Sequence, residues 1–561
     1  MARNFEKRTI ASWALVLLTF GFVLSGPPQG GPASIWPSVV AIGLAFLTRD
    51  IYSALFLGAF SGAVLLANGN VATAFVDLFS QHLIPPLTNR WNISALVFSL
   101  MMGGFVELLN RIGGLQVLAS RALGRGDSRR RVGLGVFAMG WVVFFDGLAS
   151  TMLVGKTMRP ITDRAGLSRP KLAFIVDSTA SPIAAFALIS TWIAFELTLI
   201  QNGLALYGET TFGDAAAFAG LSSYQILIET LPYRFYNYFA LAIVLLTVWL
   251  GRDIGPMRKA EEEAAADLEA APTEPLAETG EPGVSGGSGR IALTALPVLA
   301  LIGAVFGGLY VDGMAKLGPS AQGSWLDRTI QAFGQADADL VFVTATAFSI
   351  AVALAVLGLA VPERREGSVV ALFDGMRQMF LPVLILVFAF TLSSVISALD
   401  TAGWLVGVLD GQFPVVALPA MVFLLAALVS FSVGSAWGTL GVLMPLCIPI
   451  AAALTGLESG AAPGAVVIAT IGSILAGAVF GDHCSPISDT TIVAAFASGC
   501  DTVEHVRTQL PYALIAAGLA VAVGYLPAGA GLNPFVFLGL GLAACWAVIR
   551  YLGKPPAGRG A

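Results

Sequence analysis

The sequence predicts an all-α polytopic membrane protein made of two homologous halves, which we expect to be inverted repeats with broken or re-entrant helices. Three observations predict this class. The chain of 561 residues is 56% hydrophobic and only 12% charged, whereas soluble domains carry about a quarter charged residues. Apolar runs recur along its whole length, and short patterns of the first half return in the second. We expect roughly 11 to 14 membrane segments, broken ones included.

The apolar runs are long enough to cross about 30 Å of hydrocarbon. Four of them are Ile10–Leu24, Ile51–Leu66, Phe239–Leu250 and Phe380–Val395. The first run follows the basic stretch MARNFEKR, as a signal peptide would, but no small-x-small cleavage site precedes the next loop. We therefore expect it to be the first transmembrane helix.

A polar insert, Gly251–Arg290, separates the two halves. It is dominated by Ala, Glu, Pro, Gly and Ser and has no aromatic residue, so it cannot bury enough apolar area to fold. We expect a first transmembrane half at 1–250, a flexible acidic linker at 251–290 and a second transmembrane half at 291–561. Basic residues at the start of the linker favour the cytoplasmic side, where we also place both termini.

The sequence argues against several classes of protein. It has no G-x-S-x-G, H-E-x-x-H or phosphate-loop pattern, so we do not expect an enzyme. Neither a bound cofactor nor a nucleic-acid partner is expected; the surroundings are a lipid bilayer, and the candidate assembly is a homodimer. A disulfide framework or zinc site is not predicted either, because no C-x-x-C spacing links the four cysteines, Cys447, Cys484, Cys500 and Cys545.

An internal repeat is indicated by three matches that occur in the same order in both halves. The matching pairs are GGFVELLNRIGGL (103–115) with SSVISALDTAGWL (393–405), STASPIAA (178–185) with DHCSPISD (482–489), and LPY (231–233) with LPY (510–512). Duplicated halves are typical of secondary transporters, whose substrate sites form where discontinuous helices of the two repeats meet. The repeat therefore predicts a transporter.

The second match contains Ser-Pro-Ile in both halves, and proline there should interrupt a helix. Backbone left unpaired at membrane depth survives only where it lines a polar cavity. In the second half the break lies inside GDHCSPISDTT (481–491), the most polar stretch of an otherwise apolar region. We therefore predict that this stretch contains an ion site.

A sodium ion needs several oxygen ligands, including a carboxylate. Asp489 is our first candidate for the carboxylate of such a site, because it lies four residues after Ser485 and would share its helical face. Asp482 is the second candidate. The alternative is that these side chains cap the helices on either side of the break. The full candidate set of the second half is Asp482, Ser485, Ser488, Asp489, Thr490 and Thr491.

The first half offers a matching set at its own break. A charged residue within an apolar run is a functional candidate by default, which adds Asp146; an ion pair with Lys156 or Arg159 is the alternative for it. Glu196 is either a further candidate or a residue at a helix end. The candidates at the break, for which helix capping is again the alternative, are Asp177, Ser178, Thr179 and Ser181.

Two basic segments predict a hairpin. RGDSRRR (125–131) and Lys156–Lys171 should both lie in the cytoplasm, yet only residues 132–155 separate them. One crossing cannot leave both ends on the same side, so we expect a re-entrant hairpin broken near Gly147.

The histidines give weaker signals. We expect His483 to be structural or to tune the pH response, and not to bind a metal. His505, in the charged stretch CDTVEHVR, is expected to be a solvated loop residue.

A carboxylate buried in an apolar surrounding is stable only when it is protonated or paired with a cation. A carrier that cannot cross the membrane empty is an antiporter. The sequence therefore favours cation/proton exchange over a channel, which would need a repeated filter or a ring of charge.

Longer segments resemble a known family. GDHCSPISDTT followed by SGCDTVEHVRTQLPYAL (498–514), together with Val154–Glu196 in the first half, is similar to the NhaC-type sodium/proton antiporters. This resemblance implies a cation/proton exchanger of the bacterial cytoplasmic membrane. The same family contains exchangers of organic acids, such as malate for lactate, so the alternative is exchange of a small organic anion or amino acid. The stretch FFDGLAST (144–151) is less polar than the family pattern, which puts Asp146 in doubt as a ligand.

Overall fold

A computed structural model describes residues 31–556 with gaps. The residues outside the description are 1–30, 49, 115–116, 118–127, 145, 210–222, 271–288, 318–324, 326–327, 330–331, 333–334, 410–413, 456–463 and 557–561. The predicted first helix, Ile10–Leu24, therefore lies outside the described residues.

The described residues form helices, with one isolated β-bridge between Asp253 and Lys554. The helices up to the linker are α2 (Trp36–Thr48), α3 (Ile51–Leu66), α4 (Val71–Asp77), α5 (Ile84–Thr88), α6 (Arg90–Ile112), α8 (Arg129–Val142), α9 (Gly147–Arg164), α10 (Arg169–Ser178), α11 (Ser181–Ala184), α12 (Ile193–Glu209), α13 (Ser223–Thr230), α14 (Phe235–Leu250) and α15 (Gly255–Ala270).

The second half begins with the longest helix in the described part of the chain. Its helices are α16 (Gly289–Leu317), α18 (Ala338–Leu359), α19 (Ser368–Gln378), α20 (Phe380–Ala398), α21 (Thr401–Leu409), α22 (Leu418–Val433), α23 (Ala436–Leu454), α24 (Ala465–Cys484), α25 (Asp489–Ser498), α26 (Thr502–Leu519), α27 (Leu526–Gly529) and α28 (Pro534–Tyr551). Short 3-10 or π segments are Pro32–Ile35, Leu78–Leu83, Leu231–Tyr233, Pro362–Arg364, Val415–Ala417 and Ala520–Tyr525.

The predicted fold class is confirmed. Among the described residues, 9 helices are long and apolar enough to cross a membrane, and up to 11 if each of two sharply bent helix pairs is taken as one span. Three of the predicted apolar runs lie within α3, α14 and α20. The chain is thus a multi-pass membrane protein.

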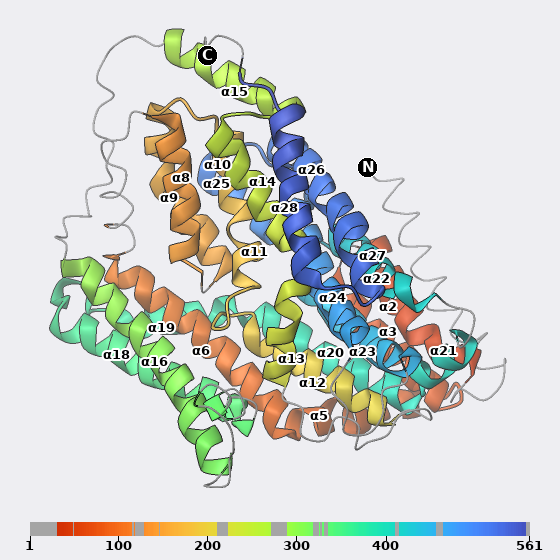
Figure 1. Ribbon diagram of the computed structural model, residues 1–561. Coiled ribbons are helices and arrows are strands. Elements are labelled where there is room, and N and C mark those ends of the chain that lie inside the picture. Colours follow the sequence, from red (N-terminus) through yellow and green to blue (C-terminus); the bar gives the residue numbers. More distant parts are fainter. Residues whose placement is uncertain are drawn as a thin grey trace.

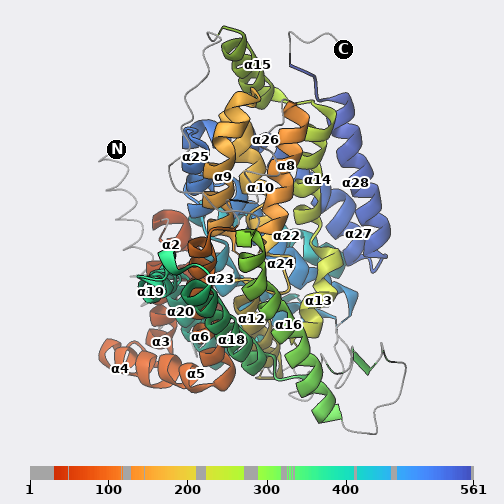
Figure 2. The same cartoon turned by 90° about the vertical axis from the view of Figure 1, so that its left-hand side faces the viewer.

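The predicted hairpin is present as α8 and α9, which lie side by side (Figures 1 and 2). The helix breaks between Val142 and Gly147. The two outer ends of the hairpin meet at one carboxylate: the Arg129 guanidinium is 2.7 Å from Glu261 Oε2, and the Ser168 N–H donates to Glu261 Oε1 at 2.8 Å. Both basic segments therefore lie at the same end of the molecule, which we call the linker end.

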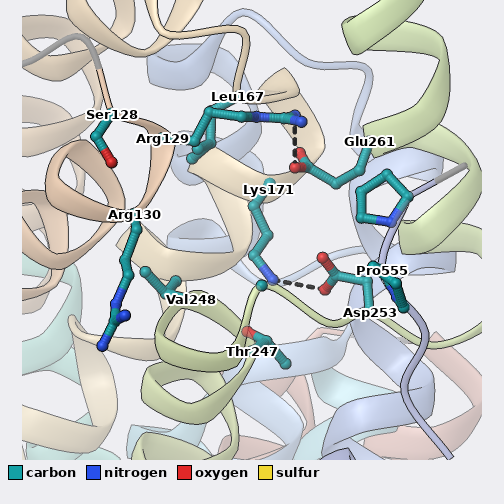
Figure 3. A pocket seen from close by; sticks show the side chains of 12 residues that line it. Ser128, Arg129, Arg130, Leu167, Lys171, Thr247, Val248, Asp253, Glu261 and Pro555 are labelled. Atoms are coloured by element: carbon teal, nitrogen blue, oxygen red, sulfur yellow. Dashed lines mark hydrogen bonds and ion pairs between the residues drawn. The ribbon is translucent and has the colours of Figure 1, made fainter. Parts of the chain in front are cut away.

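The beginning of the linker differs from the expected flexible chain. Residues 255–270 form α15, which lies across the linker end (Figure 1). Figure 3 shows how it is held: besides the Arg129–Glu261 pair, the Lys171 ammonium is 2.6 Å from Asp253 Oδ1, and both Lys171 and Asp253 are buried. The prediction from composition concerned only whether this segment could bury a hydrophobic core of its own. Residues 255–270 form a helix because they pack against other helices of the chain. Residues 271–288 lie outside the description.

Candidate functional site

Both predicted helix breaks are present, and they lie next to each other. In the first half α10 ends at Ser178 and α11 begins at Ser181. In the second half α24 ends at Cys484 and α25 begins at Asp489, with extended backbone at Ser485 and Ser488. The elements on either side pack together, α10 against α25 and α11 against α24. Polar side chains from the two halves therefore share one buried space.

Asp482 lies at the centre of a group of hydroxyls, in the last turn of α24. Ser181 Oγ donates to its Oδ2 at 2.5 Å, Ser488 Oγ donates to its Oδ1 at 3.0 Å, and Thr490 Oγ1 donates to its Oδ2 at 3.1 Å. The side chains of Asp482, Ser181, Ser488 and Thr490 are all buried. One carboxylate thus has three hydroxyl oxygens around it, one from the first half and two from the second.

Asp177, near the end of α10, has different neighbours. Its Oδ2 accepts from Gln509 Nε2 at 2.8 Å and lies 3.2 Å from His505 Nε2 and 3.3 Å from Thr491 Oγ1. Its Oδ1 is buried and accepts no hydrogen bond from the described residues. The Thr491 hydroxyl also lies 3.0 Å from the backbone oxygen of Asp482. The two carboxylates therefore belong to one connected network.

His483 is held in place by hydrogen bonds on both ring nitrogens. Ser178 Oγ lies 2.8 Å from its Nε2, and the Tyr236 hydroxyl lies 2.7 Å from its Nδ1. Gln509 donates to its backbone oxygen. These contacts fix the end of α24, which positions Asp482.

Several predicted candidates lie outside the Asp482 cluster. The Asp489 side chain is exposed and its Oδ1 accepts from the Thr490 N–H at 2.9 Å. Ser485 Oγ donates to the backbone oxygen of Phe431 at 2.7 Å, and Thr179 Oγ1 donates to that of Ile175 at 2.8 Å. Asp146 lines a separate cavity. The candidates that the structure brings together are Asp482, Ser488, Thr490, Thr491, Asp177, Ser178 and Ser181.

The expectation for His505 was wrong. It lies in the first turn of α26, its side chain is fully buried, and it contacts Asp177. The neighbouring charges in CDTVEHVR suggested a loop, but the end of an amphipathic helix has the same composition. His505 is buried because α26 packs against α10.

Two further polar residues were not predicted at all. Arg234 forms a buried ion pair with Glu196, at 2.9 Å, and donates to the backbone oxygen of Ala185 just after α11. Gln509 bridges Asp177 and His483. The repeated LPY could have indicated both, because Arg234 directly follows its first copy and Gln509 directly precedes its second.

Comparison with known proteins gives consistent matches. The Na+/H+ antiporter family matches residues 183–530. An uncharacterized protein of Haemophilus influenzae is 31% identical over 526 residues, which is 92% of this chain and 94% of that one. The arginine/ornithine antiporter ArcD of Halobacterium salinarum is 38% identical over a shorter stretch of 109 residues, 19% of this chain and 21% of that one.

A solved structure supports the fold. The Alcanivorax borkumensis YdaH transporter aligns with a TM-score of 0.53 over 86% of this chain and 91% of that one. Sequence identity is 16%, so the likeness concerns the fold alone.

Proposed function

Since the chain belongs to the Na+/H+ antiporter family, we propose that it exchanges Na+ for H+ at one buried carboxylate, Asp482, by alternating access. The chain is a secondary active transporter. We assign it to the NhaC-type branch because GDHCSPISDTT and the segment after it have that pattern. The bacterial cytoplasmic membrane, with linker and termini in the cytoplasm, is the proposed location.

The observation that carries this proposal is the group of three hydroxyls around buried Asp482. A hydroxyl has one donor hydrogen and two acceptor lone pairs. Rotation about the C–O bond lets it present either the hydrogen or a lone pair to a neighbour. The hydroxyls of Ser181, Ser488 and Thr490 can therefore donate to an empty carboxylate or turn their lone pairs toward a bound ion. Na+ prefers such oxygen ligands, and a proton on Asp482 would take its place.

Asp177 is the less suitable carboxylate for exchange. Two of its three partners present nitrogen, from Gln509 and His505. An amide NH2 group is only a donor, and so is a histidine ring nitrogen that carries a hydrogen. These groups can stabilise a fixed carboxylate but cannot coordinate a cation. We therefore assign Asp177 the role of holding α10 and α26 together beside the exchange site.

Two cavities support alternating access. A cavity of about 560 Å³ is lined by Gly103 and Glu107 in the C-terminal half of α6. Another cavity, of about 450 Å³, is lined by Asn92 near the N-terminus of α6 and by Ser393 and Ser397 of α20. Asn92 and Glu107 are about 22 Å apart along the axis of α6. In the repeat, Ser393 and Ser397 correspond to Gly103 and Glu107. Matching segments of the two halves thus line cavities near opposite ends of α6, as inverted repeats require.

The test is transport in proteoliposomes, with an imposed Na+ gradient and internal pH as the readout. If Na+ and H+ compete for Asp482, the apparent KM for Na+ rises as the pH falls, by at most about tenfold per pH unit for one proton. The slope is measured from pH 6 to pH 9. A KM that stays constant over this range would contradict a shared carboxylate, and absence of Na+-driven proton movement would contradict the exchange itself.

A further inference from the structure

A polar cavity lies at the linker end, where the N-terminus of α8 meets α14, α15 and the C-terminal segment; we call it the Arg130 cavity (Figure 3). Its volume is about 300 Å³, at the lower end of the range of ligand pockets. That is room for a polar group and not for a whole lipid molecule. The charged residues of its lining are Arg129, Arg130, Lys171, Asp253 and Glu261.

Both carboxylates of the lining already have cationic partners. Asp253 Oδ1 lies 2.6 Å from the Lys171 ammonium, and Glu261 Oε2 lies 2.7 Å from the Arg129 guanidinium. Arg130 forms no ion pair with any residue in the described part of the chain, and in Figure 3 it lies apart from both carboxylates. The lining therefore carries one positive charge that no carboxylate balances, at Arg130.

The position of Arg130 leaves its hydrogen-bond donors accessible. Its guanidinium carbon lies 4.1 Å from the centre of the Trp249 ring, and the residue is exposed. A guanidinium that stacks on an aromatic ring still presents its N–H groups in its own plane, and their spacing matches two oxygens of a phosphate. Arg130 is therefore placed to bind a phosphate group in a bidentate manner.

Other donors beside Arg130 also lack acceptors. Arg129 Nε is buried and finds no acceptor among the described residues. Ser128 is the N-cap of α8, but its side chain makes no capping hydrogen bond. The first N–H groups of α8 thus have no side-chain cap, and the partial positive charge of a helix N-terminus favours an anion. The cavity combines a full positive charge, a hydroxyl and uncapped N–H groups, which are the usual ligands of phosphate.

The cavity lies at the level where membrane helices end. Figure 2 shows α8, α14 and α28 side by side, and α14 packs against both of the others. Trp249, in the last turn of α14, and Tyr551, the last residue of α28, are exposed. Exposed tryptophan and tyrosine are typical of the boundary between hydrocarbon and headgroups. Arg252 and Lys554 follow shortly after them. This places the Arg130 cavity at headgroup level.

The face of α8 that begins at Arg130 continues as an apolar stripe. Leu134, Phe137 and Trp141 follow Arg130 at helical spacing, so they share its face, and they are half-buried or exposed. The opposite face packs inward, since a Cβ added to Gly133 would lie 2.7 Å from Val248. An acyl chain can lie along this stripe, whereas a soluble phosphate ion would make no use of it. The stripe therefore favours a lipid as the source of the phosphate.

We propose that the Arg130 cavity binds the phosphate headgroup of an anionic phospholipid. Arg130, the Ser128 hydroxyl and the N-terminus of α8 hold the phosphate, and the acyl chains lie along the apolar stripe of α8. Basic pockets between membrane helices bind anionic headgroups in this way. The inference goes beyond Na+/H+ exchange, and none of these residues belongs to the proposed exchange site.

The test is binding of a radiolabelled short-chain phosphatidylglycerol to the purified full chain in a neutral detergent. We expect saturable binding. Phosphatidylcholine of the same chain length should bind at least about tenfold more weakly, because its choline cation cancels the charge of its phosphate. Inorganic phosphate should displace the lipid only at concentrations at least about a hundredfold above the Kd of the lipid.

Variants of two neighbouring arginines locate the site. Arg130→Gln should weaken binding of phosphatidylglycerol by about tenfold or more, since it removes the charge and the bidentate donors. Arg130→Lys keeps the charge and should lose about threefold. Arg131→Gln is the matched control and should stay within about twofold of wild type, because Arg131 is also exposed but does not line the cavity. Unchanged midpoints of thermal unfolding show that the variants are folded.

Three outcomes would overturn the proposal. Equal weakening by Arg130→Gln and Arg131→Gln would mean that the whole basic surface attracts the lipid. Equal binding of phosphatidylcholine would mean that the charge of the headgroup is not recognised. Displacement by inorganic phosphate at the Kd of the lipid would mean that the cavity takes soluble phosphate. Because the readout is binding, the absence of Na+-driven proton movement would contradict the proposed exchange and leave this inference intact.

Discussion

The two helix breaks have the same Ser-Pro-Ile pattern, yet they hold their carboxylates in different ways. In the first half Asp177 is held by Gln509 and His505, and in the second half Asp482 is held by three hydroxyls. Both side chains are buried. What differs is whether the neighbours can change from donors to acceptors. An amide NH2 group can only donate, whereas hydroxyls can serve a carboxylate, a carboxylic acid or a bound cation.

The largest expected effect is that of Asp482→Asn. It should lower Na+-driven proton movement by about a hundredfold or more, because the ion would face a neutral amide and the proton would have no acceptor. Internal pH in proteoliposomes is the measurement. Asp489→Asn is the informative control, since the exposed Asp489 lies outside the hydroxyl cluster and this variant should keep measurable exchange. If Asp489→Asn abolished exchange and Asp482→Asn did not, Asp489 would be the exchange carboxylate.

Asp177→Asn should act on stability more than on exchange. Removing one partner of a buried polar contact leaves the other without its hydrogen bond, which typically costs about 1 to 3 kcal/mol. Asp177→Asn and His505→Gln should therefore each lower the midpoint of thermal unfolding in detergent, and the double variant should lose less than the two single losses combined. The Na+ KM should still rise as the pH falls. Loss of exchange in a stable Asp177→Asn protein would show that the two carboxylates are equivalent.

The smallest effects are expected from the hydroxyls. Ser181→Ala and Thr490→Ala each remove one hydrogen bond to Oδ2 of Asp482. Such a bond is worth about 1 kcal/mol, so each change should raise the Na+ KM by about fivefold. The two should be non-additive in a double-mutant cycle, because both hydroxyls contact Oδ2 of Asp482. Ser485→Ala should add independently to Ser181→Ala, since its hydroxyl bonds to Phe431. Strong coupling between Ser181 and Ser485 would contradict the observed geometry.

Local chemistry made much of this fold predictable. Long apolar runs have to be helices in a membrane because their backbone groups have no other partners there. Proline in Ser-Pro-Ile breaks both helices wherever they lie in the fold, and both breaks were found near Ser181 and Ser485. The hairpin of α8 and α9 followed from charge alone, because basic segments at both of its ends favour one side of the membrane.

The choice between Asp482 and Asp489 did not follow from local chemistry. The prediction for Asp489 assumed that a helix resumes directly after Pro486, so that positions four apart share a face. In the structure Ser485 and Ser488 are extended and α25 begins only at Asp489. The break therefore resets the helical phase, and the position of α25 against α10 determines which side chains point inward.

The sequence by itself determined that this chain is a membrane protein with two polar helix breaks, because hydropathy, proline and the positions of basic residues act within a few residues of the chain. Tertiary packing alone decided three other features. His505 is buried because α26 packs on α10, α15 is folded because Asp253 and Glu261 find cationic partners on α10 and α8, and Asp482 is central because the hydroxyl of Ser181 comes from the other half. These contacts join residues that lie 82 to 328 positions apart. They leave no local pattern, since neither partner needs its neighbours in the sequence to be of any particular kind.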